Sequence, residues 1–374
     1  MQQLTKHSLA VSEPAGYPRV IEVGYRFSKD FDGINPPRLV NTVVAILEGR
    51  NRAPKDTIEV ELINSTNGSK EVKELMGKRF VVGEKASRRG GKPLFMCGSD
   101  AKIQFALPVV LAMFGSEELS EVVSTLILSL PDADGAKELF GALAQDSQRL
   151  KQVVSGKHVF RWNGLLITRQ IDEVDCAYEG EGVRDWGIWH GLVPADSGLL
   201  VVDLGGKTAN LVPLDEEGEV IPEHHISFDS GGTLNLANRI AQDDDFRARF
   251  GSGYRLEEIM HSIHKAYEFA ALYGEEADPI LGTGYNAIHF KDVFVRHREA
   301  WVDDIFGKLD SRLKDHWSLF GRGIFVAGSA NLLTHRLEGQ DFFVVAPDAQ
   351  TAHIKGLMLR YAPTLARVWV TQND

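Results

Sequence analysis

Residues 199–213 read LLVVDLGGKTANLVP, and this stretch decides the fold of the chain. Its leading apolar residues predict a strand that ends at Asp203. Gly205 and Gly206 then predict a tight turn, and the residues from Ala209 to Pro213 predict a returning strand. Such a hairpin suits phosphate binding, because backbone N–H groups without neighbouring Cβ atoms can approach phosphate oxygens closely. Taken alone, the segment fits an ordinary glycine-rich hairpin equally well.

The ending Gly206-Lys207-Thr208 invites comparison with a P-loop. That motif needs a glycine at position 201, where the chain has Val, and it opens a helix, whereas the residues after Thr208 predict a strand. We therefore exclude a P-loop. In the hairpin, Thr208 can add a hydroxyl donor, and Asp203 is placed to hold Mg²⁺ through water.

A related pattern stands near the start of the chain. Residues 19–25 predict a strand, and residues 27–31 predict a second strand after a tight turn. Glu22-Val23-Gly24 and Asp203-Leu204-Gly205 each place an acid at a strand end, followed by an apolar residue and a turn glycine. They lie 203 − 22 = 181 positions apart, about half of the 374 residues. This spacing predicts a duplicated, two-lobed protein with one phosphate-binding hairpin from each lobe facing a shared cleft.

Composition narrows the functional classes. With 41 Lys and Arg against 52 Asp and Glu, the formal net charge is −11, which disfavours direct binding to nucleic acid. Cys97 and Cys176 are too few for a disulfide framework or a four-cysteine zinc site, so we expect a cytoplasmic protein. No apolar stretch reaches the length of a membrane span, and residues 1–18 predict a flexible arm, not a signal peptide.

Strands mixed with helices throughout the chain predict an α/β architecture. Residues 51–78 are polar and are expected to form an exposed excursion. The remaining strands are expected within residues 39–47, 79–83, 158–178, 323–327 and 343–346. The helices are expected over residues 101–113, 119–130, 233–241, 256–272 and 293–313, and from 349 onward.

Other motifs carry less weight. Residues 282–287 fit the GxGxxG/A pattern, but they lack a full preceding strand and a following helix, so we interpret them as a loop. His261 and His264 have no acid or cysteine at a spacing that completes a zinc site. We therefore interpret them as histidines on the surface of a helix. Glu179 and Glu181 directly follow an apolar strand, and Gly180 and Gly182 next to them leave the carboxylates accessible. In a nucleotide cleft such a carboxylate could orient or deprotonate the water that attacks a γ-phosphate. A polar turn is the alternative.

In this order, the motifs resemble those of the actin-like ATPase superfamily, and within it the ParM/StbA plasmid-segregation actins and their archaeal relatives. Residues 80–86, FVVGEKA, resemble that group's strand and turn after the first hairpin. The resemblance implies an actin-like (ribonuclease H-like) duplicated fold with a nucleotide cleft between the lobes. Its domains would be an arm at 1–18, domain I at 19–185 completed by the helix at 349–374, and domain II at 186–348.

The resemblance also implies site roles. Glu179 would be the catalytic carboxylate with Glu181 in reserve, and Asp203, with Glu22 at the matching position, would hold Mg²⁺ through water. Nucleotide contacts would come from both hairpins, a Gly-Gly helix start and a late loop. These residues are Gly24, Tyr25, Ser28, Lys29, Gly205, Gly206, Lys207, Thr208, Gly231, Gly232, Gly328, Ser329, Ala330 and Asn331.

Two departures concern the first hairpin, where Glu22 stands in place of the family's Asp, and the bulky Arg26 and Phe27 crowd the turn. The function implied is a filament-forming ATPase or GTPase that uses Mg²⁺ and acts in plasmid or other DNA segregation. Its partners would be further copies of itself and a DNA-binding adaptor, with no membrane. The alternatives are a small-molecule kinase of the same superfamily, for which Asp175 and Asp185 lack the expected context, and a nucleotide-binding scaffold without catalysis.

Overall fold

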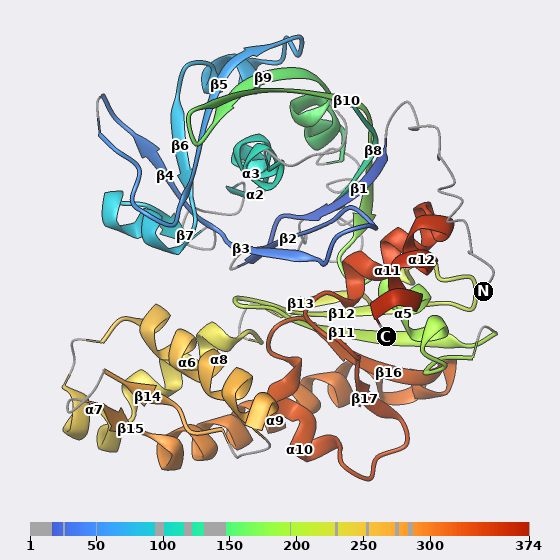
Figure 1. The fold of residues 1–374 in the computed structure, drawn as a ribbon. Helices are drawn as coiled ribbons and strands as arrows, with labels where there is room; N and C mark the ends of the chain where they lie inside the picture. The colour runs from blue at the N-terminus through green and yellow to red at the C-terminus, as the bar shows by residue number, and fades with distance from the viewer. Residues whose placement is uncertain are drawn as a thin grey trace, which may run out of the picture.

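The computed structural model describes residues 17–24, 27–49, 51–93, 101–115, 122–130, 147–194, 196–228, 231–251, 254–273, 277–282 and 287–373. Two lobes stack one above the other, each built on its own sheet (Figure 1). Among the described residues, the sheet of the upper lobe contains ten strands from the first half of the chain, and the main sheet of the lower lobe contains five from the second half. None of the helices in these residues is long and apolar enough to cross a membrane.

The sheet of the upper lobe has the order β3-β2-β1-β8-β10-β9-β5-β6-β4-β7. Its strands are β1 (Tyr17–Glu22), β2 (Phe27–Phe31), β3 (Arg38–Asn41), β4 (Val43–Leu47), β5 (Ile58–Ser65), β6 (Arg79–Val82), β7 (Lys92–Pro93), β8 (Val122–Leu130), β9 (Gly156–Trp162) and β10 (Leu165–Tyr178). The sheet curls around helices α2 (Ala101–Gln104) and α3 (Ala106–Met113) (Figure 1). All eight residues of α3 are buried, as an apolar sequence without a polar face requires.

Two expectations for this lobe are wrong. Of the helix predicted over 119–130, the described residues 122–130 instead form the strand β8, which lies between β1 and β10 and is parallel to both. Residues 51–78 are not a mere polar excursion, because they contain β5 and a short helix, α1 (Lys70–Leu75). Ile58, Val60 and Leu62 alternate with Glu59 and Glu61, so one face of β5 packs inward against the core.

The sheet of the lower lobe has the order β13-β12-β11-β16-β17. Its strands are β11 (Gly198–Leu204), β12 (Ala209–Leu214), β13 (Ile226–Phe228), β16 (Phe320–Val326) and β17 (Phe343–Val345). Helices α6 (Thr233–Gln242), α7 (Asp244–Phe250), α8 (Leu256–Tyr273), α9 (Lys291–Leu313) and α10 (Thr334–Leu337) surround it. The short pair β14 (Ile280–Leu281) and β15 (Ile288–His289) flanks the GxGxxG/A segment, of which residues 283–286 lie outside the described residues.

A close helix crossing lies between the two sheets. Helix α5 (Val183–Trp189) packs against α11 (Ala352–Tyr361), which is followed by α12 (Pro363–Asn373). At the crossing, Gly182 and Gly356 come so near that a Cβ on Gly356 would lie 1.6 Å from the Gly182 carbonyl oxygen. His353 joins the same region, since its Nε2 lies 2.9 Å from Ser129 Oγ on β8 and its Nδ1 accepts a hydrogen bond from the Gly182 N–H.

The topology aligns the ends of several strands at the cleft. β1, β8 and β10 run parallel in the upper sheet, and β11 and β16 run parallel in the lower sheet. Glu22 ends β1, Glu179 follows β10, Asp203 lies near the end of β11 and Gly328 follows β16. Ligands of open α/β sheets bind beyond the carboxyl ends of the strands, so the topology places the candidate site between the lobes.

Candidate functional site

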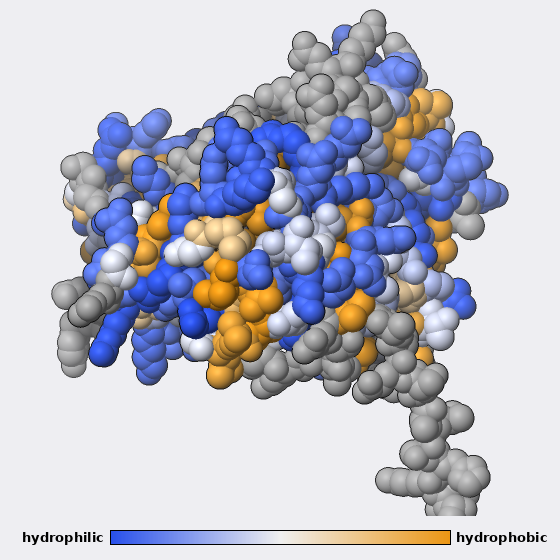
Figure 2. Space-filling model, turned by 90° about the horizontal axis from the view of Figure 1, so that it is seen from above, coloured by the Kyte–Doolittle hydropathy of each residue, from blue (hydrophilic) through white to orange (hydrophobic). Residues whose placement is uncertain are grey.

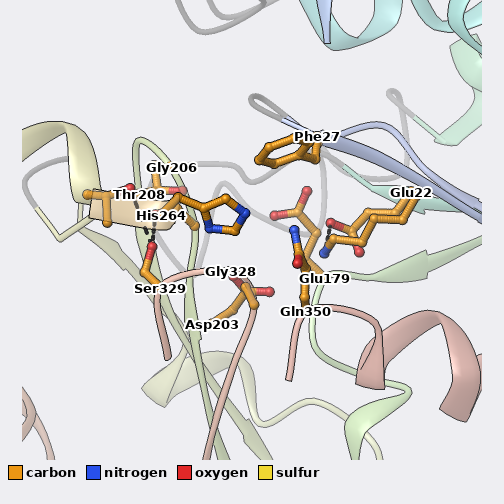
Figure 3. A pocket seen from close by; sticks show the side chains of 15 residues that line it. Glu22, Phe27, Glu179, Asp203, Gly206, Thr208, His264, Gly328, Ser329 and Gln350 are labelled. Carbon is orange, nitrogen blue, oxygen red and sulfur yellow. Dashed lines mark hydrogen bonds and ion pairs between the residues drawn. The ribbon is translucent and has the colours of Figure 1, made fainter. Parts of the chain in front are cut away.

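A pocket of about 610 Å³, its open mouth included, lies between the strand ends of the two lobes. Figure 3 shows its side chains converging from β1, β2, β10, β11, α8 and the turn after β16. The lining residues are Glu22, Gly24, Phe27, Lys29, Glu179, Asp203, Gly205, Gly206, Thr208, Thr233, His264, Ala327, Gly328, Ser329 and Gln350. Both predicted hairpins and the predicted strand-end acid thus contribute to one cavity.

A buried ion pair from the first hairpin lies at the upper side of this pocket. β1 and β2 place Glu22 and Lys29 opposite each other, and Lys29 Nζ lies 2.6 Å from Glu22 Oε1. Burial lowers the pKa of Lys29, but the carboxylates of Glu22, Asp203 and Glu179 outweigh it and raise that pKa above its ordinary value. Lys29 therefore stays charged. The other carboxylate oxygen of the pair, Glu22 Oε2, is buried and has no hydrogen-bond partner among the described residues.

The two predicted glutamates after β10 point to different surroundings. Glu179 lines the pocket, and Asn210 on β12 donates a hydrogen bond of 3.3 Å to its Oε2. Glu181 instead forms an ion pair with Arg360 of α11 and accepts a hydrogen bond from the backbone N–H of Tyr178. Glu179 is therefore the carboxylate of this turn that faces the cleft, whereas Glu181 fastens the turn to α11.

The second hairpin is held by the start of helix α6. The N–H groups of Gly232, Thr233 and Leu234 donate to the carbonyl oxygens of Lys207, Gly205 and Gly206, respectively. In a trans peptide the N–H points opposite to the C=O, so the hairpin amides that share these peptides point away from α6. Such amides can bind phosphate oxygens, and the hydroxyl of Thr208 lines the same pocket.

The turn after β16 closes the lower side of the pocket. Ala327 adopts a left-handed conformation with φ 71°, which is uncommon for a residue with a side chain. Two residues further on, the Ser329 hydroxyl oxygen lies 3.3 Å from both the Gly205 carbonyl oxygen and the Thr233 hydroxyl oxygen, within hydrogen-bonding distance of each. Through these bonds the turn, the hairpin and α6 form one unit.

A second pocket of about 680 Å³ adjoins the first, and Thr233, His264, Ala327, Gly328, Ser329 and Gln350 line both. Its further lining consists of Met260, Ile263, Tyr267, Glu268, Asn331 and Leu332. Glu22, Lys29, Glu179 and Asp203 therefore line only the first part of the cleft, whereas the side chains of Met260, Ile263 and Leu332 line only the second part. This division matches a ligand with a phosphate end and a flat apolar end.

Some predicted residues lie beside the pocket and do not line it. Ser28 is buried against Thr42 with 3.1 Å between their hydroxyl oxygens, and Ala330 lies in the core. Gly231 and Gly232 pack on the hairpin, where a Cβ would lie 2.2 Å from Ala209 Cβ or 2.4 Å from the Lys207 carbonyl carbon. Lys207 is absent from the residues that line either pocket, and Tyr25 lies outside the described residues.

Sequence reasoning missed five residues that line the first pocket, including Ala327, which was expected only as the end of a strand. His264 was expected on the outer surface of its helix, and Thr233 and Gln350 were not considered. Phe27 was expected only to crowd the first turn, yet its ring lies in the pocket opposite His264 (Figure 3). No local motif marks these positions, because distant elements bring them together.

The electrostatics of the pocket favour a bound cation. Glu22, Glu179 and Asp203 supply three negative charges against the single positive charge of Lys29, so the formal sum is −3 + 1 = −2. The unpartnered Glu22 Oε2 is a suitable oxygen ligand for Mg²⁺. Within the described residues, no three His, Cys, Asp or Glu side chains are close enough to hold a metal directly. The residues therefore fit a Mg²⁺ that keeps much of its hydration, as this ion usually does.

Comparisons with known proteins agree with this architecture. No protein-family model matches the sequence, and neither does any curated protein sequence. Solved structures do match over nearly the whole chain, and they define the actin-like fold.

One similar structure is Ta0583, an archaeal actin homologue, with 13% identity and a TM-score of 0.68 over 95% of this chain and 99% of that one. The ParM filament from Clostridium botulinum has 14% identity and a TM-score of 0.66 over 95% and 99%. Bacillus thuringiensis ParM with ATP has 14% identity and a TM-score of 0.65 over 96% and 99%. The predicted two-lobed, actin-like α/β fold and its resemblance to ParM-type proteins are confirmed.

Proposed function

We propose that this chain is a nucleotide-dependent, filament-forming actin-like protein of the ParM type, which hydrolyses ATP or GTP. The observation that carries the proposal is the meeting of two hairpins and three carboxylates, from both lobes, in one cleft. Similar structures support it, since one ParM forms a 15-stranded filament and another was solved with ATP. The predicted domain limits, with domain I ending at residue 185, belong to the same proposal.

In this proposal the phosphates lie against the second hairpin. Its amides and the Thr208 hydroxyl bind phosphate oxygens, and Lys29 supplies the positive charge of the pocket. Glu179 accepts the proton of the attacking water or orients that water toward the γ-phosphate. Asn210 holds the Glu179 carboxylate from behind by the 3.3 Å hydrogen bond described above.

Asp203 and Glu22 would hold a Mg²⁺ ion through its water ligands. When bound, the ion would neutralise charge on the β- and γ-phosphates. The sum of −2 in the pocket favours binding of such a cation together with a polyphosphate, because like charges repel one another. The nucleoside would occupy the adjoining pocket, which Met260, Ile263 and Leu332 line.

The cellular role belongs to this proposal as well. Nucleotide binding would favour head-to-tail assembly, and a repeated contact that does not close produces a filament. Plasmid or other DNA segregation in the cytoplasm would then require an adaptor that binds DNA, since the chain carries a net charge of −11. The kinase alternative gains no support, because neither Asp175 nor Asp185 lines the cleft and both make hydrogen bonds elsewhere.

Sedimentation at tens of micromolar protein with Mg²⁺ and ATP, GTP, ADP or no nucleotide tests the assembly, with negative-stain images of each pellet. We expect filaments with a triphosphate. A protein that remains monomeric with every nucleotide would contradict the proposal.

Phosphate release tests the catalytic role. Glu179→Gln is expected to keep nucleotide binding and to lower hydrolysis by about 10²-fold or more, since general-base catalysis contributes that much. Glu181→Gln is the matched control, because this acid is bound to Arg360 and not to the pocket, so its hydrolysis should stay near that of the wild type. Equal hydrolysis by Glu179→Gln and the wild type would remove Glu179 from the mechanism.

A further inference from the structure

A pair of aromatic rings bridges the cleft between the two lobes. Phe27 belongs to β2 of the upper lobe and His264 to α8 of the lower lobe. Their ring centroids lie 5.7 Å apart at an interplanar angle of 37°, which is a favourable distance for an aromatic contact. Both rings line the phosphate pocket, and Figure 3 shows them facing each other.

His264 lies where the two pockets of the cleft meet. His264 lines both pockets, whereas Phe27 lines only the polar one. The histidine therefore stands at the junction between the two parts of the cleft. A nucleotide that fills both parts must pass beside its ring.

Each ring is held by its own lobe. His264 Nε2 lies 3.0 Å from Glu268 Oε1, one turn further along α8, so the ring is fixed on its helix. Phe27 is paired with Asn41 in the ladder between β2 and β3. Gly24 closely approaches Phe27, because a Cβ on Gly24 would lie 2.2 Å from the Phe27 carbonyl oxygen. Since neither ring is on a free loop, the distance between them follows the separation of the lobes.

We propose that Phe27 and His264 form a gate across the cleft that retains bound nucleotide, and that His264 is an additional nucleotide-contacting residue at the junction of the two pockets. This inference rests on the proposed function, since it assumes that a nucleotide occupies the cleft. Phe27 acts as a positioning residue that holds the His264 ring over the ligand. Opening of the cleft must separate the rings, so their contact slows release.

The size of the effect follows from the kind of contact. An aromatic pair contributes enough beyond its buried area to change a rate by about two- to tenfold. The change is expected mainly in the dissociation rate, because most differences between related complexes lie there. The two rings act through one contact, so the effects of removing them should not add.

Stopped-flow release of fluorescent methylanthraniloyl ATP and ADP, chased by unlabelled nucleotide in the presence of Mg²⁺, measures this rate on the full-length chain. Phe27→Ala and His264→Ala should each speed release by about two- to tenfold. The double variant should release no faster than the faster single variant. Phe27→Tyr keeps the aromatic ring and should release nucleotide as slowly as the wild type. Phe27→Leu keeps most of the side-chain volume but no ring, and it should release nucleotide as fast as Phe27→Ala.

The same helix offers matched controls. Phe269→Ala and His261→Ala change one aromatic residue each in α8 at positions that line neither pocket, and both should leave the release rate unchanged. Circular dichroism and the melting temperature check that every variant folds.

Three outcomes overturn the inference. Release at the wild-type rate from folded Phe27→Ala and His264→Ala would refute the gate while leaving the proposed function intact. Additive effects in the double variant would show two separate contacts with nucleotide and no gate. A wild-type chain that binds neither labelled nucleotide would overturn both the gate and the proposed function.

Discussion

The substitution Gly356→Ala tests the packing that joins the lobes. Gly356 lies within α11, where an alanine would ordinarily stabilise the helix by about 0.5–1 kcal/mol. Here the added Cβ would lie 1.6 Å from the Gly182 carbonyl oxygen and 2.6 Å from its carbonyl carbon. Since Cβ atoms essentially never approach within 3.0 Å, the helices must separate by at least 3.0 − 1.6 = 1.4 Å. The obstacle is backbone, which cannot rotate away as a side chain can.

This separation sets the expected loss. Overpacking a well-filled site costs about 1–3 kcal/mol, and a backbone obstacle places the cost near 3 kcal/mol. The unfolding entropy is about 2.1 cal/mol/K per residue, so 374 residues give about 0.8 kcal/mol/K, and 3 kcal/mol lowers the melting temperature by about 4 °C. Calorimetry and urea unfolding of the nucleotide-free protein measure the change.

Gly307→Ala is the matched control. Gly307 also lies within a helix, α9, but a Cβ there meets no atom within 4 Å. This substitution should therefore raise stability by about 0.5–1 kcal/mol. If Gly356→Ala melted at or above the wild-type temperature, the close approach of α5 and α11 would be wrong.

Two further predictions concern buried titratable side chains. The pKa of His353 is lowered to about 3, chiefly by burial and also by Lys29, and burial lowers the pKa of His225 to about 4. Both rings are neutral in the fold and are protonated in the unfolded chain below its pKa of about 6.5. The free energy of unfolding therefore falls as the pH drops below 6.5, by about 2 kcal/mol per histidine between pH 7 and 5. In urea unfolding, His353→Gln or His225→Gln should each remove that histidine's part of the pH dependence. Lys29→Met leaves the Glu22 carboxylate buried without its partner and should destabilise the protein by about 3 kcal/mol. The double variant with Glu22→Gln should recover most of this loss. An equal loss of stability in the single and double variants would contradict the prediction.

The hairpins could be predicted because their signals are local. The second strand of the first hairpin, Phe27–Phe31, and the strands on either side of residues 205–208 appear where the sequence indicates them. An apolar run, a turn glycine and a second run lie within a dozen residues, so no distant contact is needed to recognise them.

Strand β8 could not be recognised in the same way. Its run VVSTLILSL has six apolar residues of nine without strict alternation, because the strand lies inside the sheet between β1 and β10. A short continuous apolar run does not distinguish a buried strand from a buried helix by periodicity. In β5, by contrast, the alternation of Ile58, Val60 and Leu62 with glutamates was present, and the polar composition of the surrounding residues concealed it.

Only some residues of the candidate site are marked by local features of the sequence. Strand-end acids and turn glycines are local features, and the structure brings Glu22, Glu179 and Asp203 to one pocket. Phe27, His264 and Gln350 reach it only because the lobes face each other, so no spacing in the sequence relates them. The resemblance already favoured Glu179 over Glu181, but the contact of Glu181 with Arg360 could not be read from the sequence, since the two residues lie 179 positions apart.

The first hairpin shows why Glu22 need not prevent metal binding. A longer acid than the family's Asp could have displaced the ion, but Lys29 binds only Oε1 of Glu22 and leaves Oε2 without a partner in the described structure. The carboxylate thus satisfies a buried ammonium with one oxygen and keeps the other for a hydrated cation. An unsatisfied buried oxygen is costly, and that cost falls when a cation or its water binds there. The pocket's sum of −2 acts in the same direction, so nucleotide and Mg²⁺ should bind together, each raising the affinity for the other.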